Sequence, residues 1–178
     1  GDGSLGGKAR GLAFMNSMLV KYHLYDKYPD VRIMIPRTLV VATDYFDEFI
    51  RENELQFVIN SDMSDEDILS EFVSSRLPQA LLDSLRVYIR YTKGPLAIRS
   101  SSKLEDSYYQ PFAGVYSTYM IPKAGDDQMM RMLSRAIKSV YASVYFASSR
   151  AYITATNNVI SDEKMAIVIQ FLLHLFAL

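Results

Sequence analysis

The sequence predicts an α+β fold, because helical and strand-like segments are mixed along the chain without a regular alternation. The helical segments show apolar residues that recur every three or four positions, and the strand-like segments are short apolar runs next to proline or glycine. The chain has 178 residues, of which 49% are hydrophobic and 22% are charged, and its net charge is −1. These values are typical of one globular domain.

Composition excludes several kinds of chemistry. The 19 basic residues are balanced by 20 acidic ones, which leaves no strongly basic footprint for a nucleic-acid backbone. The chain has no cysteine, so it forms no disulfide and offers no thiol nucleophile or cysteine-ligated metal site. No secretory leader is recognised at its start, and its longest apolar run is too short for a bilayer. We therefore expect a cytoplasmic protein without membrane contact.

The first half of the chain is predicted to be mostly helical. A first helix covers residues 7–25, and the run PRTLVVAT from Pro36 is a strand. Thr43 is the expected N-cap of a helix over residues 44–51. Ser64 and the carboxylates after it begin another helix, so the acidic run 62–67 is interpreted as a helix start and not as a metal site. The apolar positions of the first two helices are Leu12, Met15, Leu19, Tyr22, Tyr45, Phe46, Phe49 and Ile50.

The second half supplies most of the predicted sheet. GPLAIRSS, AGVYSTYMI and KMAIVIQ are strand-like runs, and Pro78 begins a helix before the first of them. The longest helix starts near Asp126 and has apolar residues in steps of three and four. Tyr141, Tyr145 and Tyr152 fall in this helical region, where we expect packed rings with hydroxyls at the rim of the core.

The glycine-rich stretch GSLGGKARG, residues 3–11, contains Lys8 and opens the first predicted helix, where N–H groups and the helix dipole favour an anion. It is not a Walker A loop, because the spacing before the Gly-Lys pair is too short and Ala9 follows the lysine. It also lacks the preceding strand and the glycine spacing of a dinucleotide fingerprint. On this stretch alone, a phosphate loop and an ordinary turn with a solvated lysine are equally open.

A second polar cluster lies in PLAIRSSSKLEDSYYQPFAGVYSTYM, residues 95–120. Arg99 stands at the end of an apolar strand and serines follow it, so a guanidinium and several hydroxyls emerge where the strand meets a loop. Such donors hold phosphate oxygens in a fixed geometry. The alternative is that Arg99 pairs with Glu105 or Asp106 and that the serines cap a turn.

Several stretches together resemble, in the same order, the nucleotide-binding domain of the phosphoenolpyruvate synthase and pyruvate phosphate dikinase family. They are GSLGGKARGLAFM, IMIPRTLVVATDYFDEFI, PLAIRSSSKLEDSYYQPFAGVYSTYM, AIKSVYASVYFASSRAYI and KMAIVIQ. The resemblance implies the N-terminal portion of an ATP-grasp-type domain. It divides the chain into a partial ATP-binding domain, residues 1–170, and an apolar tail, residues 171–178, that does not resemble the family continuation. We therefore expect a fragment or the product of a shortened gene.

The resemblance implies roles for two charged residues. Lys8 and Arg99 correspond to the family's lysine and arginine on the ATP phosphates, and they are the expected catalytic residues. Because phosphoryl transfer depends mostly on positioning and charge neutralisation, their expected contribution is electrostatic. The opening stretch is thus expected to be a phosphate loop of the synthase type.

Further nucleotide contacts follow from the same resemblance. Gly114 and Thr118 fall on the loop that covers the phosphates, where glycine permits close backbone approach. Tyr119 follows them, and its backbone amide is another expected donor. Gln170 matches the glutamine that ends the strand on the adenine and ribose side. Val115 stands where many relatives have glutamine, so any role of that side chain is absent here.

The expected function is that of an ATP-dependent phosphotransferase with paired acceptors. In the full-length family enzyme, ATP, pyruvate and water give AMP, phosphoenolpyruvate and phosphate through a phosphohistidine on a swivelling domain, with Mg²⁺ as second cofactor. The sequence contains no matching phosphohistidine motif, magnesium ligands or pyruvate-binding barrel, so no metal ligand is assigned and this chain alone is expected to be inactive. Two alternatives stay open. One is a related dikinase acting on a glucan or an antibiotic, and the other is a non-catalytic ATP-binding or interaction module whose open sheet edge would allow a homo-oligomer.

Overall fold

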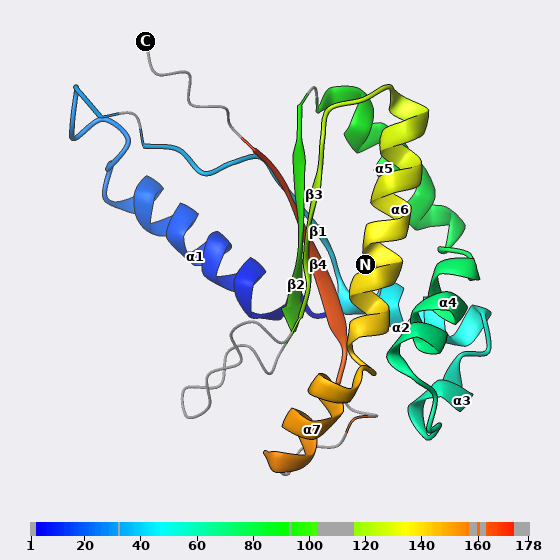
Figure 1. The fold of residues 1–178 in the computed structure, drawn as a ribbon. Coiled ribbons are helices and arrows are strands. Elements are labelled where there is room, and N and C mark those ends of the chain that lie inside the picture. The colour runs from blue at the N-terminus through cyan, green and yellow to red at the C-terminus, as the bar shows by residue number, and fades with distance from the viewer. Residues whose placement is uncertain are drawn as a thin grey trace.

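A computed structural model describes residues 3–31, 33–92, 94–102, 116–156, 160 and 163–172. Within these ranges, a four-stranded antiparallel sheet in the order β1-β4-β2-β3 lies between helix α1 and the helices α2 to α6, and α7 lies below its lower end in the view (Figure 1). The mixed helix and sheet content confirms the α+β prediction. The strands are β1 (Thr38–Val41), β2 (Leu96–Ser102), β3 (Thr118–Ile121) and β4 (Met165–Phe171).

The helices occupy the segments whose apolar period predicted them, with some differences at their ends. The first helix ends at Lys21, earlier than predicted, because the chain turns at His23 with φ of 51°. Ser64 is the N-cap of α4 as predicted, and its side chain accepts a hydrogen bond from the Asp67 N–H. The helices are α1 (Gly6–Lys21), α2 (Thr43–Glu52), α3 (Gln56–Ile59), α4 (Asp65–Ser74), α5 (Gln79–Tyr91), α6 (Asp126–Ser143) and α7 (Ala147–Ala155).

The prediction for Thr43 is wrong, because the cap position of α2 is Ala42 and Thr43 is the first helical residue. The Thr43 side chain instead faces the start of the chain. Its hydroxyl accepts a hydrogen bond from the Ser4 N–H at 2.9 Å. A threonine at a helix start is therefore used for a tertiary contact and not for a local cap.

Strand pairing determines which side chains share a face of the sheet. Ile98 pairs with Ile169 of β4 and with Tyr119 of β3, whereas Arg99 pairs with Val168 and Thr118. Because successive side chains of a strand point to opposite faces, the two sets lie on opposite sides. Ile98 and Ile169 belong to the main core, toward α6, and the set with Arg99 lies on the side of α1.

The core beside α6 contains a group of contacting aromatic rings. Phe46 packs edge-on against Tyr141 with 5.0 Å between ring centroids, and Phe49 lies 5.6 Å from Phe72 and 5.5 Å from Tyr141. The prediction that the Tyr141 hydroxyl lies at the rim of the core is wrong, because the whole side chain is buried and its hydroxyl has no hydrogen-bond partner among the described residues. Phe46 and Phe49 of α2 surround it, so the position is inside the core.

None of the helices in the described part of the chain is long and apolar enough to span a membrane.

Candidate functional site

The first turn of α1 is fixed against the end of strand β2. The Ser101 hydroxyl donates to the Leu5 carbonyl at 3.0 Å and accepts from the Ala9 N–H at 3.3 Å. Ser101 is fully buried, so its hydroxyl is committed to holding the helix. Ser101, one of the serines predicted to donate to phosphate, therefore has a structural role.

Gly6 explains why this stretch is rich in glycine. Its φ is +68°, and a Cβ atom at this position would lie 1.9 Å from the Ser101 carbonyl oxygen. Only glycine adopts this conformation at so close an approach without strain. The local geometry lets the start of α1 lie directly against the backbone of β2.

Lys8 lies in the first turn of the helix and reaches the same strand. Its side chain is half-buried, and its Nζ donates to the Ser100 hydroxyl at 3.3 Å. Ser100 is itself buried. The flexible stem of lysine allows the ammonium group to move between such a hydroxyl and a ligand.

Arg99 is the residue before Ser100 and has a different environment. It is exposed in the middle of a strand whose other residues are buried. Among the described residues, nothing forms a hydrogen bond or an ion pair with its guanidinium group. Lys8 thus contacts β2 at the residue next to Arg99, but the Ser100 side chain belongs to the face of Ile98 and the Arg99 side chain to the opposite face. The alternative partners Glu105 and Asp106 lie outside the described residues.

Two other predicted residues share a face of the sheet with Arg99. Thr118 is directly opposite Arg99 in the pairing of β2 with β3, and it is exposed. Gln170 pairs with Ala97, two positions along β2, so it lies about 7 Å from Arg99 in the strand direction. The Gln170 side chain is half-buried, and its amide nitrogen is 3.5 Å from the Thr38 hydroxyl.

The remaining predicted residues are not brought to this face by their side chains. Tyr119 pairs with Ile98, so its half-buried ring points toward α6, and only its backbone is near Thr118. Gly114 lies outside the described residues. The predicted set therefore divides into three parts: Arg99, Thr118 and Gln170 share a face of the sheet, Lys8 reaches the neighbouring Ser100, and Tyr119 contributes backbone alone.

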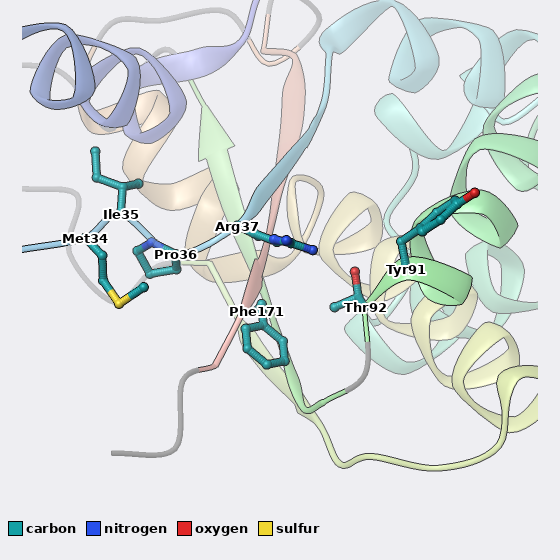
Figure 2. A pocket seen from close by; sticks show the side chains of 7 residues that line it. All are labelled: Met34, Ile35, Pro36, Arg37, Tyr91, Thr92 and Phe171. Atoms are coloured by element: carbon teal, nitrogen blue, oxygen red, sulfur yellow. The ribbon is translucent and has the colours of Figure 1, made fainter. Parts of the chain in front are cut away.

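Two hollows border the end of the sheet near Gln170, and the sequence analysis did not identify either. One is an apolar groove of about 390 Å³ between α1 and the segment before β1, with Leu12, Phe14, Met15, Met18, Leu19, Met34, Ile35 and Pro36 as its walls. The other is a pocket of about 160 Å³ beside the end of β4 (Figure 2). It is lined by Met34, Ile35, Pro36, Arg37, Tyr91, Thr92 and Phe171, and Arg37 points toward Tyr91 and Thr92.

Comparison with known proteins identifies the family. A family model described as pyruvate phosphate dikinase, AMP/ATP-binding domain, matches residues 2–174. The chain belongs to this family. Its resemblance to the dikinase nucleotide-binding domain, stated above from short stretches, is therefore confirmed over nearly the whole sequence.

The chain is also similar to part of a curated protein. The chain is 29% identical over 139 residues to the uncharacterized phosphotransferase YvkC of Bacillus subtilis (strain 168). The match covers 78% of this chain and 16% of the relative, so the chain spans a small part of that protein's length. The family model describes an AMP/ATP-binding domain, and the relative is a phosphotransferase by name.

Proposed function

We propose that the chain is the ATP-binding portion of a phosphoenolpyruvate synthase-like phosphotransferase, with Lys8 and Arg99 on the nucleotide phosphates. The observation that carries this proposal is that Lys8 of α1 reaches Ser100, the residue next to Arg99 in β2, although the side chains of Ser100 and Arg99 point to opposite faces of the strand. Lys8 comes from α1 and Arg99 from the centre of the sheet, and they are 91 positions apart in the sequence.

The two cations have complementary properties for a polyphosphate. Arg99 presents a planar guanidinium that binds two oxygens at once, whereas Lys8 presents a compact charge on a flexible stem. In phosphoryl transfer, charge shifts onto the transferring group and its oxygens, and fixed positive charges stabilise it. Neither residue is proposed as a nucleophile.

The order of these residues along β2 gives a direction for the bound nucleotide. Lys8 reaches β2 at Ser100, and Gln170 pairs with Ala97, so about 10 Å of strand separates the two positions. Polar and charged groups near Ser100 give way to an apolar groove near Gln170. This polarity supports phosphates toward Lys8 and Arg99, and the adenine and ribose toward Gln170, with Thr118 and the Tyr119 amide as donors beside Arg99.

Magnesium accompanies ATP in the family, but the described residues do not fit a metal site. No group of three or more His, Asp or Glu residues among them is arranged to hold a cation. No step of the proposed chemistry is therefore assigned to the metal through this chain. For the full-length protein, the proposal includes transfer of phosphate to pyruvate by a swivelling histidine domain. A related enzyme that acts on a glucan or an antibiotic would use the same nucleotide site.

Calorimetric titration of the chain with magnesium and a non-hydrolysable ATP analogue tests the proposal. We expect the parent to bind and a Lys8→Ala, Arg99→Ala double variant to lose at least tenfold in affinity, because each charge-assisted contact contributes about 1.5–3 kcal/mol. Circular dichroism should show that the double variant is folded.

A matched control removes the same two charges elsewhere. Lys27→Ala with Arg86→Ala changes the net charge equally, at an exposed turn and on the surface of α5. We expect this control to bind like the parent. Equal binding by all three proteins would show that the nucleotide contacts are misassigned, and no binding by the parent would overturn the proposed function.

A further inference from the structure

Two hydrogen bonds attach the residues before α1 to the start of α2. The Thr43 N–H donates to the Ser4 carbonyl at 3.0 Å, and the Thr43 hydroxyl accepts from the Ser4 N–H at 2.9 Å. Both polar groups of the Ser4 backbone are thus satisfied by one residue. Thr43 is 6% exposed, whereas Ser4 is exposed, so these bonds are partly buried.

A second attachment lies on the other side of Lys8. Ser101 bonds the Leu5 carbonyl and the Ala9 N–H, one before Lys8 and one directly after it. Ser4 and Leu5 are therefore held on the N-terminal side of Lys8, and Ala9 on its C-terminal side. The lysine backbone is fixed between Thr43 and Ser101, which belong to different elements of the fold.

These contacts concern a helix that is otherwise weakly held. Of the 16 residues of α1, the buried ones are Gly6, Gly7 and Ala9, all in its first turn. The cap position, Leu5, makes no side-chain cap hydrogen bond. The direction of the helix start thus depends on the attachments at Ser4, Leu5 and Ala9, because little side-chain packing fixes it.

We propose that Thr43 is a positioning residue of the nucleotide site, which acts with Ser101 to hold the Lys8 backbone against the end of β2, within reach of Ser100. This inference rests on the proposed function, in which Lys8 binds phosphate. Thr43 does not touch the nucleotide. Its effect on binding is transmitted through Ser4 to the first turn of α1, and so to the ammonium group of Lys8.

A double-mutant cycle distinguishes this role from general stabilisation. Thr43→Val keeps the shape of the side chain and removes the acceptor for the Ser4 N–H. We expect it to weaken binding of the ATP analogue about fivefold, because one part-buried hydrogen bond that holds the start of α1 is lost. In a Lys8→Ala background the same substitution should change affinity less than twofold, since there is no ammonium group left to position.

Two further variants complete the test. Thr43→Ser retains the hydroxyl and should bind like the parent, whereas Thr154→Val repeats the chemical change at an exposed site of α7 and should have no effect. A fivefold loss that persists in the Lys8→Ala background would overturn the positioning role, as would failure of Thr43→Ser to restore affinity.

Hydrogen exchange tests the attachment without nucleotide. Thr43→Val should increase exchange of the amides at residues 4–9, while amides in α6 keep the parent's protection. Unchanged exchange at residues 4–9 would overturn the inference even if the chain binds ATP. Absence of nucleotide binding by the parent would instead overturn the proposed function, so the two failures are distinguishable.

Discussion

The two faces of the sheet are built for different purposes. The face toward α6 is closed by side chains such as Leu133 and Ile137, which are fully buried against Ile98 and Ile169. On the other face, α1 touches the sheet at its first turn and then diverges from it (Figure 1). Phe14 and Met15 in the middle of that helix are 63% and 51% exposed.

The difference shows how stability and binding are separated in this molecule. Apolar contacts that stabilise the fold are concentrated on one face, where each buried side chain is worth about 1.5–3 kcal/mol. The predicted binding residues Lys8, Arg99, Thr118 and Gln170 are on or beside the other face, where charged and polar groups need not be buried. Substitutions on the two faces should therefore differ in their effects on the free energy of unfolding and on nucleotide binding.

A phenylalanine on each face gives the largest contrast. Phe49 is fully buried among Phe46, Phe72 and Tyr141, so Phe49→Ala should lower the free energy of unfolding by about 3–5 kcal/mol. Phe14→Ala removes the same atoms from a mostly exposed site and should change it by no more than about 0.5 kcal/mol. Urea denaturation of both variants measures the difference. Similar losses in the two would show that α1 is packed as firmly as the core.

Two glycines within α1 should respond in opposite directions to the same substitution. Gly6→Ala forces a side chain into the left-handed region and onto the Ser101 carbonyl, so we expect a loss of about 1–3 kcal/mol and weaker nucleotide binding. Gly11→Ala has open space around it and should stabilise the helix by about 0.5–1 kcal/mol. Thermal denaturation with calorimetric titration measures both. If Gly6→Ala left the stability of the protein unchanged, the close approach to Ser101 would not explain why glycine occupies this position.

Sequence periodicity predicted the packed face better than the open one. The steps of three and four in α6, and the apolar runs of β2 and β4, follow from burial on that face, and the structure confirms them. The same period in residues 7–25 also predicted a helix, but nothing in it revealed that Met15 and Tyr22 would be exposed. Exposure depends on how α1 is directed, which is set by contacts with distant residues.

In the candidate site, too, features that depend on neighbouring residues could be predicted from the sequence, and features that depend on distant residues could not. Short motifs predict Lys8 and Arg99 as site residues, because their residue types and flanking glycines and serines resemble the family pattern, and this assignment stays a prediction. The tasks of Thr43 and Ser101 were not predictable, since each depends on a hydrogen bond across 39 or more positions of sequence. The division of the chain at residue 170 stays a prediction, although β4 continues through Phe171.

The smallest predicted effect concerns one hydroxyl in the packed face. The Tyr141 hydroxyl is buried without a hydrogen-bond partner among the described residues, which is costly for a polar group. Tyr141→Phe removes that hydroxyl and keeps the ring contacts with Phe46 and Phe49. We expect the free energy of unfolding at pH 7 to be unchanged or to rise by about 1 kcal/mol.

The pH dependence of the same variant separates this explanation from a packing effect. Burial raises the pKa of Tyr141, and the charges of Asp44 and Asp47 raise it further, whereas the unfolded chain should show the ordinary pKa of about 10. Below pH 10 both states hold the proton, so this contribution to stability is complete. Above about pH 10 the unfolded state loses the proton while the folded state keeps it, and stability falls as pH rises, by at most about 1.4 kcal/mol per pH unit.

Tyr141→Phe should remove this part of the alkaline loss, and Tyr22→Phe, which changes an exposed tyrosine, should leave it as in the parent. If urea denaturation between pH 9 and about 11 gave the same slope for parent and Tyr141→Phe, ionisation of that hydroxyl would not limit the stability of the packed face.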